Sequence, residues 1–363
     1  MIKTNFNKNI IYHSTWIEIY PGGGEACDLN ILKILSNLSN KKILLIGSIT
    51  NIKFFNFFKS TYKFNFFGKF IRDIFQFLII FNSINLYLRK YKLKIDKNFI
   101  LFYSGRIGGL YLLTLFRPNL QVIYNVHGLC NKYFFKKLYK KNNIKFIFWG
   151  RAEDNIINFS LKKKKEKFIT LIPSSNNLKL FKKNFYEEYP LLKINNQKKK
   201  LTLIWIGRLE PIKNPMRLIE IAEKNPKILI YIVGNGSLMK KLKTKIQTRK
   251  LLNLKIFGHL DNQKIKKLID KSDFHLMTSQ SENYPLVIQE AMANRMISIV
   301  PNISCFNKLD FPNLNFYEED NLLNNKIIKA NWDSKLEESA YRFFENHSEE
   351  NNKKLIKKLI NFF

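Results

Sequence analysis

Acidic residues are few in this chain. Its 363 residues include 28 aspartates and glutamates against 62 lysines and arginines, which gives a formal net charge of +34. Such an imbalance favours a nucleic acid, an anionic lipid surface or a phosphate-bearing substrate as partner. The lysines run through nearly every segment, so a compositional bias with solvated lysines explains the charge equally well. Because the sequence has no recognisable nucleic-acid module, we expect no nucleic-acid partner.

Cysteine is also scarce, and its spacing argues against two common uses. Cys27, Cys130 and Cys305 are odd in number, lie far apart and form no C-x-x-C pair. This spacing argues against a disulfide framework and against a zinc site, and it fits a reducing cytoplasm. The sequence has no Asp-x-Asp pair and no His/Cys cluster either, so we expect no metal and no cofactor.

Long hydrophobic runs are missing as well. The most apolar stretch, 74–88, is interrupted by Gln76, Asn82, Ser83 and Asn85. It is shorter than the roughly 20 apolar residues that a membrane-spanning helix needs, so we predict a buried helix there. Polar residues soon follow the short apolar run 10–12, which argues against a secretory leader. We therefore expect a cytoplasmic chain.

The sequence does have a regular alternation of short β-rich runs and longer helical patterns, which is typical of βα units and parallel sheets. We predict an α/β fold of two doubly wound, Rossmann-like domains. The first covers 1–187, a polar linker covers 188–200, the second domain covers 201–333, and a helical tail covers 334–363. The predicted strands are 43–47, 99–103, 122–126, 146–149, 168–172, 202–206, 228–233, 254–257, 274–277 and 297–300.

Two glutamates follow the predicted strand at 274–277. Pro285 suits the first turn of a helix, so Glu282 is expected on the loop at the carboxyl end of the strand and Glu290 inside the helix. Glu290 lies four residues after Leu286, and we expect it on the helix face that this leucine buries. A carboxylate there needs a donor. A ribose diol, a backbone N–H or a lysine could supply it.

A second group of residues begins where the predicted strand 202–206 stops. Gly207 permits a tight exit from the strand, and Arg208 and Lys213 then lie near the start of the next helix. Two cations and free backbone N–H groups at that position can hold a diphosphate. The chain has 62 lysines and arginines, and the spacing and location of Arg208 and Lys213 distinguish them from the others.

Weaker signals stand at other strand ends. Gly234 and the His259–Leu260 pair follow predicted strands, and the glycines permit either a close approach of backbone to ligand or simply a tight turn. The three glycines 22–24 open a helical pattern without forming a known phosphate loop. His127 ends another strand, where a hydrogen-bonded structural histidine is the more common case.

Taken in order, these motifs resemble the retaining GT-B glycosyltransferases of the group 1, glycogen synthase-like, family. The second half reads WIGRLEPIKNP, VGNG, FGHL and SENYPLVIQEAMA, and the first half adds the glycines before Glu25, His127 and the I-P-S at 172–174. The resemblance implies two Rossmann-like domains that face each other across a cleft. It also implies transfer of a sugar from a nucleotide-diphosphate sugar without a metal, with retention of the anomeric configuration.

The resemblance also implies roles for individual residues. The catalytic residues would be Glu282, His127, Arg208 and Lys213. Glu282 would contact the transferred sugar, Arg208 and Lys213 would stabilise the leaving diphosphate, and His127 would contact the sugar or assist near the acceptor. The donor-binding residues would be Gly23, Gly24, Arg208, Lys213, Gly234, His259, Leu260, Glu282, Asn283, Tyr284, Pro285, Leu286 and Glu290, the last holding the ribose.

Three positions depart from the family pattern. Asn283 and Pro285 stand where the family commonly has glycines, and Arg295 stands where it commonly has glycine. The expected acceptor is a glycan or lipid-linked glycan of polysaccharide or lipopolysaccharide assembly, reached by peripheral contact with the anionic inner face of the membrane. Two alternatives remain open: a GT-B-like nucleotide-sugar epimerase, and a basic protein that binds nucleic acid or a membrane surface.

Overall fold

The chain forms two compact units in the computed structural model, which describes residues 9–14, 23–38, 43–47, 66–94, 99–127, 131–150, 166–172, 201–282, 284–307, 309–318, 331–361 and 363. Unit 1 is Met1–Pro173 with Glu349–Phe363, and unit 2 is Ser174–Ser348. The predicted linker, 188–200, lies outside the described residues.

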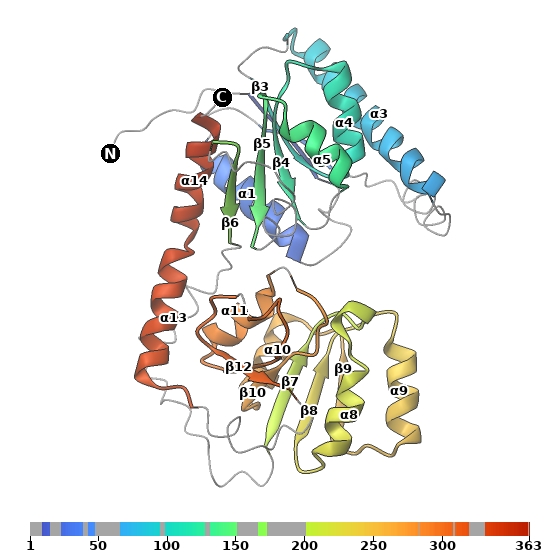
Figure 1. The fold of residues 1–363 in the computed structure, drawn as a ribbon, viewed down its shortest axis with the longest axis vertical. Helices are drawn as coiled ribbons and strands as arrows, with labels where there is room; N and C mark the ends of the chain where they lie inside the picture. Colours follow the sequence, from blue (N-terminus) through green and yellow to red (C-terminus); the bar gives the residue numbers. More distant parts are fainter. Residues whose placement is uncertain are drawn as a thin grey trace. The chain divides into compact units, whose positions relative to one another are not determined.

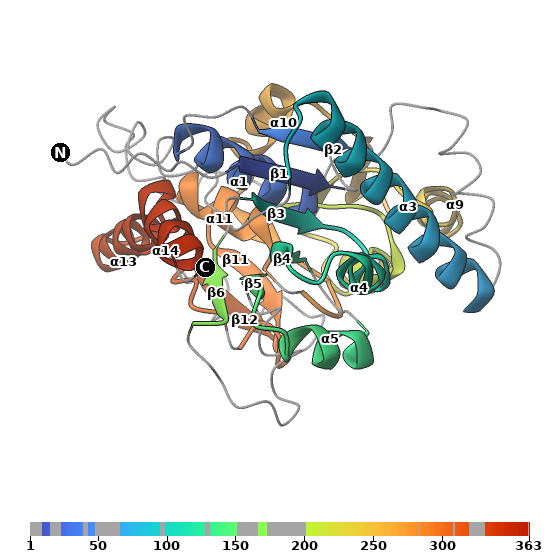
Figure 2. The same cartoon turned by 90° about the horizontal axis from the view of Figure 1, so that it is seen from above.

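Unit 1 contains a six-stranded parallel sheet with the strand order β2-β1-β3-β4-β5-β6 (Figure 2). Its strands carry hydrophobic residues that are buried on both faces of the sheet, as is usual for parallel sheets. In β3, for example, Leu101 and Tyr103 face one helical layer, and Ile100 and Phe102 face the other. The strands are β1 (Asn9–Ser14), β2 (Leu44–Gly47), β3 (Phe99–Ser104), β4 (Gln121–Val126), β5 (Ile144–Trp149) and β6 (Phe168–Leu171).

Helices cover both faces of this sheet. One layer consists of α3 (Phe66–Lys90), α4 (Ile107–Phe116) and α5 (Lys132–Tyr139), and the other of α1 (Gly23–Leu38) and α14 (Glu349–Asn361). The helix expected to be buried at 74–88 lies within α3 but is buried on one side only. Ile80 and Ile84 face the core, whereas Leu86 on the outer side is 66% exposed. That prediction is corrected because α3 is amphipathic: Asn82 lies on the exposed side with such leucines, whereas Gln76 is buried on the core side.

Unit 2 contains a second six-stranded parallel sheet, in the order β12-β11-β10-β7-β8-β9 (Figure 1). Its strands are β7 (Thr202–Ile206), β8 (Leu229–Val233), β9 (Leu254–Gly258), β10 (Phe274–Leu276), β11 (Ser298–Pro301) and β12 (Leu314–Tyr317). One face packs against α8 (Arg217–Lys224) and α9 (Met239–Thr248), and the other against α10 (Asn262–Ile269) and α11 (Leu286–Ala293). A 3₁₀ turn, η1 (Pro211–Lys213), follows β7.

The end of the chain is divided between the two units. In unit 2, α13 (Ser334–Asn346) packs Phe343 and Phe344 against the α11 side of the core. In unit 1, α14 buries Ile356 and Leu359 beside β6, and Asn352 Nδ2 donates to the carbonyl of Ile172 over 2.8 Å. The segment expected to form one tail therefore contributes one helix to each unit. Among the described helices, none is long and apolar enough to cross a bilayer.

The two parallel sheets confirm the predicted α/β class, and two strands were not predicted. The first, β1, lies between β2 and β3 in the sheet. Its sequence ends in His13 and Ser14, which are buried although polar. The second, β12, is short and only partly buried. β1 has only the short apolar run 10–12 before these polar residues, and Asn315 interrupts the apolar residues of β12.

Candidate functional site

In unit 2, three neighbouring strands end in closely packed glycines. The N–H of Gly207 donates to the carbonyl of Val233 over 3.0 Å, and the N–H of Gly234 donates to the carbonyl of Gly258 over 2.7 Å. Gly234 has φ +139°, and a Cβ added there would lie 1.8 Å from the Gly207 carbonyl oxygen. No side chain fits at Gly234. The glycines let the loops after β7 and β8 lie against one another at the carboxyl edge of the sheet.

Lys213 and Glu282 meet at this edge. Lys213 Nζ donates to Glu282 Oε1 over 2.5 Å, and the two side chains are 24% and 8% exposed. The sequence separates them by 69 residues, and η1 brings the lysine to the loop after β10. The structure therefore places two of the predicted catalytic residues in one ion pair.

Hydrogen bonds to the loop after β10 hold η1 in place. Trp205 Nε1 donates to Thr278 Oγ1 over 2.9 Å, and that hydroxyl donates to the carbonyl of Lys213 over 2.8 Å. The N–H of Gln280 donates to the carbonyl of Ile212 over 3.0 Å. Thr278 is 1% exposed, so this connection is made inside the protein. Trp205 and Thr278 are supporting residues that the sequence did not reveal.

Arg208 precedes Lys213 on the connection that follows β7, and its side chain is exposed. It forms no ion pair with any other residue that the structure describes. Two residues further on, Glu210 accepts from the Ser237 N–H over 3.0 Å and from its hydroxyl over 2.7 Å. These bonds, with a smaller effect of Arg208, lower the pKa of Glu210.

Glu210 joins the loop after β7 to the loop that leads into α9. Two backbone bonds support the same contact, from the Leu209 N–H to the Asn235 carbonyl and from the Leu238 N–H to the Leu209 carbonyl, both over 2.9 Å. Sequence reasoning missed Glu210, because its partner lies 27 residues away.

Glu290 does not lie where we expected it. The buried side of α11 consists of Ile288, Gln289, Ala291, Met292 and Ala293. Leu286 is only half-buried and Glu290 is exposed, so the expected burial is wrong. The two residues do share a helix face, but the opposite face packs on the sheet. Surrounding protein still desolvates the carboxyl group and raises the pKa of Glu290.

The other predicted donor-binding residues of unit 2 lie in two separate places, at the start of α11 and after β9. Pro285 is buried at the N-cap of α11, and Tyr284 is half-buried against Phe311, with ring centroids 4.9 Å apart. The hydroxyl of Tyr284 accepts from Gln289 Nε2 over 2.9 Å. His259 is exposed after β9, and Leu260 packs partly against the α10 side of the core. Asn283 lies outside the described residues.

In unit 1, His127 follows β4 and contacts a buried carboxylate. His127 Nε2 lies 2.9 Å from Asp28 Oδ1, with side chains 13% and 0% exposed. The same nitrogen lies 2.8 Å from Ser104 Oγ and 3.0 Å from Asn125 Nδ2. The predicted Gly23 and Gly24 are the first two residues of α1, and Asp28 lies further along the same helix. Asp28 was not predicted.

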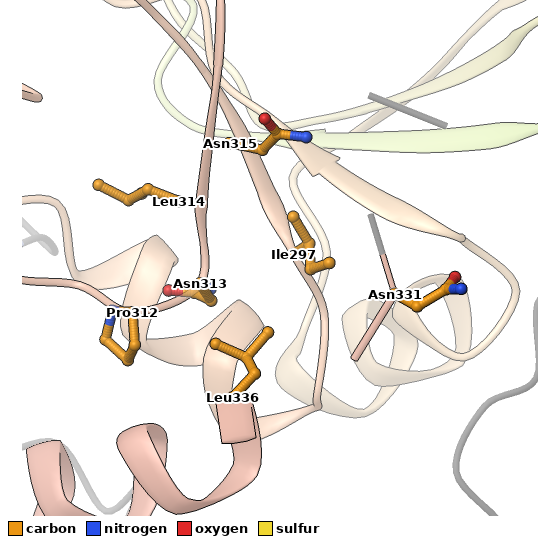
Figure 3. Close-up of a pocket in the computed structure, with 7 residues that line it drawn as sticks. All are labelled: Ile297, Pro312, Asn313, Leu314, Asn315, Asn331 and Leu336. Carbon is orange, nitrogen blue, oxygen red and sulfur yellow. The ribbon is translucent and has the colours of Figure 1, made fainter. Parts of the chain in front are cut away.

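A further depression lies elsewhere in unit 2. It has a volume of about 290 Å³ and is lined by the seven residues drawn in Figure 3: Ile297, Pro312, Asn313, Leu314, Asn315, Asn331 and Leu336. Ile297 and Asn313 directly precede β11 and β12, so the depression is at the amino ends of these strands. Arg208 and Glu282 follow carboxyl ends, at the opposite edge of the sheet. In open α/β sheets ligands bind at the carboxyl edge, and we do not assign the depression to the candidate site.

Metal ligands are not grouped in the part of the chain that the structure describes. Within it, no group of three or more His, Cys, Asp and Glu side chains is arranged to hold an ion. Arg208 and Lys213 both carry positive charge at the carboxyl edge of the unit 2 sheet.

Comparisons with known protein sequences match parts of the chain. Residues 192–309 match the family described as "Glycosyl transferases group 1". The UDP-Gal:alpha-D-GlcNAc-diphosphoundecaprenol alpha-1,3-galactosyltransferase of Escherichia coli is 32% identical over 157 residues, covering 39% of this chain and 40% of that enzyme. The matched part thus spans less than half the length of this curated relative.

Solved structures match nearly the whole chain. Anabaena HepE in complex with UDP and glucose has a TM-score of 0.65 at 14% identity, covering 98% of this chain and 100% of that one. A glycosyltransferase from Rickettsia africae has a TM-score of 0.60 at 16% identity, covering 98% of each. S. aureus TarM matches 76% of this chain and 57% of its own with a TM-score of 0.51 at 21% identity. At these identities the likeness concerns the fold, and it confirms the expected GT-B fold.

Proposed function

We propose that this chain, which belongs to the group 1 glycosyltransferases of the GT-B fold, transfers a hexose from a uridine diphosphate sugar to a glycan acceptor. The observation that supports this most is the Lys213–Glu282 pair, with Arg208 on the neighbouring loop at the carboxyl edge of the unit 2 sheet. A uridine nucleotide is proposed because HepE was solved with UDP and the E. coli relative is named for UDP-Gal.

In this proposal Arg208 and Lys213 bind the diphosphate. Cleavage of the bond between sugar and diphosphate builds negative charge on the leaving group, and fixed cations stabilise that charge more as it forms. A lysine ammonium has three N–H donors. One bond to Glu282 leaves two donors of Lys213 for phosphate oxygens. The exposed Arg208 can reach a ligand without breaking an ion pair of the described residues.

The two glutamates then have separate tasks. Glu282 holds Lys213 in position and contacts the transferred sugar, and the accessible Glu290 accepts hydrogen bonds from the ribose diol. The first N–H groups of α11 add donors for the phosphate or the sugar, since Pro285 leaves its start without a side-chain cap. We propose that transfer retains the anomeric configuration, with the acceptor attacking the face from which the diphosphate leaves.

We also propose that no metal is required. Arg208 and Lys213 supply the charge that a divalent cation supplies in other nucleotide-dependent enzymes. Transfer that persists in EDTA would support this. Transfer that stops in EDTA and returns with Mg²⁺ would contradict it.

For the acceptor side we propose unit 1, with His127 near the acceptor, whereas the glycines that open α1 approach the diphosphate of the donor. A lipid-linked glycan at the inner face of a membrane is the acceptor class that we propose, because the E. coli relative is named for a diphosphoundecaprenol acceptor. The net charge of +34 is favourable for peripheral contact with anionic lipid. Co-sedimentation with vesicles that does not depend on anionic lipid would count against this contact.

Incubation with radiolabelled UDP-sugars, with and without a lipid-linked acceptor, tests the proposed activity. Label that moves to the acceptor supports transfer. Label that stays on the nucleotide as a different sugar indicates the epimerase alternative instead. Tight, salt-resistant, sequence-selective binding in a gel shift would favour the nucleic-acid alternative. A thermal-shift screen of nucleotide sugars identifies the donor to use.

A further inference from the structure

Asp28 is a buried carboxylate of unit 1 with several hydrogen-bond donors around it, and it has been given no role so far. Its side chain is fully buried. Oδ1 accepts from the Tyr12 hydroxyl over 3.0 Å and from Asn125 Nδ2 over 2.6 Å, and Oδ2 accepts from the Ser14 hydroxyl. Burial and the nearby carboxylate raise the pKa of Tyr12 well above its ordinary value, so this hydroxyl remains a donor. Among the described residues that contact Asp28, only His127 can become a cation.

The orientation of the Asn125 amide is fixed from its other side. Trp149 Nε1 donates to Asn125 Oδ1 over 2.5 Å, and an indole nitrogen can only donate. The Asn125 NH₂ group therefore points to Asp28 and to His127 Nε2. The His127 ring is also stacked on Trp149, with an interplanar angle of 7° and centroids 6.4 Å apart. The ring thus has defined neighbours on its face and at Nε2.

Two kinds of neighbour compete for Nε2. The Asn125 amide and the Ser104 hydroxyl could donate to a lone pair on Nε2, whereas an ionised Asp28 can only accept a proton from it. A lone pair facing a carboxylate at 2.9 Å would be repulsive. A hydrogen bond to a charged group is roughly twice as strong as one between neutral groups. The bond to Asp28 therefore determines which nitrogen of the His127 ring carries the proton. In the neutral ring Nε2 then carries the proton, and Nδ1 has the lone pair.

We propose that Asp28 is a positioning residue that holds His127 in the Nε2–H tautomer, so that Nδ1 of the neutral ring is a hydrogen-bond acceptor and a substrate group that meets it must donate. The substrate part of this inference rests on the function proposed above, and the tautomer does not. It adds a requirement for the ligand: the group that meets His127 must be a donor. A deoxy or O-methyl analogue at that position loses the bond, because the neutral ring offers no N–H at Nδ1.

The tautomer can be measured without activity. We would label the full chain with ¹⁵N-histidine, assign the His127 signals by loss in His127→Gln, and record long-range ¹H–¹⁵N spectra above the titration range. The chain has five histidines. Burial lowers the pKa of two of them, His13 to about 4 and His275 to about 3, so these stay neutral. The proposal predicts a protonated Nε2 and an unprotonated Nδ1 for His127.

Asp28→Asn is the informative variant, because it keeps the shape of the side chain and removes the charge. Asn125 and Ser104 remain as donors, so His127 should move toward the Nδ1–H tautomer. Transfer should lose roughly 10- to 100-fold in kcat, as for residues that orient a histidine, with the donor KM changed less than about twofold. Tyr12→Phe is the matched control, since it removes a different donor to Asp28 and should leave the His127 tautomer unchanged.

A wild-type spectrum with the proton on Nδ1 would overturn the proposal, and this result is available even if Asp28→Asn does not fold. An Asp28→Asn protein with unchanged tautomer and unchanged kcat would overturn it too. The Nε2–H tautomer in a wild-type protein without any transfer would contradict the proposed function and leave the assignment of the tautomer to Asp28 standing.

Discussion

Arg295, in the turn after α11, forms a two-point ion pair with Glu337 of α13: Nη2 lies 2.6 Å from Oε1, and Nε lies 3.1 Å from Oε2. Arg295 has φ +55°, a left-handed conformation that favours glycine. The family's common glycine at this position is thus explained by the backbone. Here an arginine accepts that conformation and connects α11 to α13.

The ion pair predicts that Glu337→Ala destabilises the protein. The two side chains are 9% and 15% exposed, and Trp332 Nε1 also donates to Glu337 over 2.6 Å. The substitution removes a two-point ion pair from a largely buried arginine, which costs about 3 kcal/mol. Urea unfolding measures this loss.

The neighbouring Glu338→Ala is the matched control. Glu338 pairs with Arg342 on the surface, with side chains 63% and 71% exposed, so its loss should cost less than about 0.5 kcal/mol. Equal effects of the two substitutions would show that the Arg295–Glu337 pair is no more important than a surface pair.

Gly234→Ala is predicted to distort the loops that carry Arg208 and Ser237. The added methyl group would overlap the Gly207 carbonyl oxygen, and φ is +139°. We expect a loss of more than about 2 kcal/mol in unfolding free energy, together with weaker binding of UDP in calorimetry.

Gly258→Ala separates backbone strain from steric overlap. Gly258 has φ +71°, but a Cβ there would meet nothing within 4 Å. Only the left-handed conformation opposes the substitution, at about 1 kcal/mol. A Gly234 variant as mild as the Gly258 variant would argue against the tight packing of Gly234 on Gly207.

Lys213 and Glu282 are predicted to act as a unit. Lys213→Ala and Glu282→Gln should each lower kcat roughly 100-fold, because one removes a cation from the leaving group and the other releases that cation from its position. The double variant should be less impaired than the product of the single effects, as expected for residues in contact. Steady-state kinetics of the four proteins measures the coupling.

Lys266→Ala serves as the control for removal of a lysine from unit 2. Lys266 of α10 forms a largely exposed ion pair with Asp270 at the end of that helix, and neither residue belongs to the proposed site. Its kinetics should equal those of the wild type. Fully multiplicative effects at Lys213 and Glu282 would contradict a shared role.

Glu290 predicts a pH dependence of stability. Its folded pKa is raised above the ordinary value of 4.5 by desolvation. The folded state therefore binds this proton more tightly than the unfolded state, and the associated stability is present below the unfolded pKa and lost as pH rises through the folded pKa. Relative to Glu290→Gln, the wild type should lose stability between about pH 4 and about pH 7. The difference should be small, because the side chain is accessible. Unfolding curves at the two pH values test the sign of this change. A wild type that becomes more stable relative to Glu290→Gln as the pH rises would contradict it.

The parts of the site that the sequence predicted are those encoded by local spacing. Arg208, Lys213 and Glu282 could be placed at strand ends because each follows an apolar strand closely, and parallel strands bring their carboxyl ends to one edge. Asp28 could not be found in this way. Its partners Asn125 and His127 lie 97 and 99 residues away, and nothing in the residues around it marks a buried carboxylate.

Periodicity was also insufficient to say which face of a helix is buried. It grouped Glu290 correctly with Leu286, but the side of α11 that packs is set by contacts with the sheet and with α13. β1 was missed for a similar reason. His13 and Ser14 are polar, and they are buried only because β1 lies between two other strands of the sheet. His13 Nδ1 contacts the Ile46 carbonyl over 3.1 Å, a contact between neighbouring strands.

The central claim is that the carboxyl edge of the unit 2 sheet binds a nucleotide sugar for transfer. Its most direct test is acceptor-dependent transfer of label from a radiolabelled UDP-sugar, measured for the wild type, Arg208→Ala and Glu290→Ala. We expect transfer by the wild type and a loss of roughly 100-fold in kcat/KM for each variant, with unfolding curves like that of the wild type for both. Unchanged rates in both variants would contradict it.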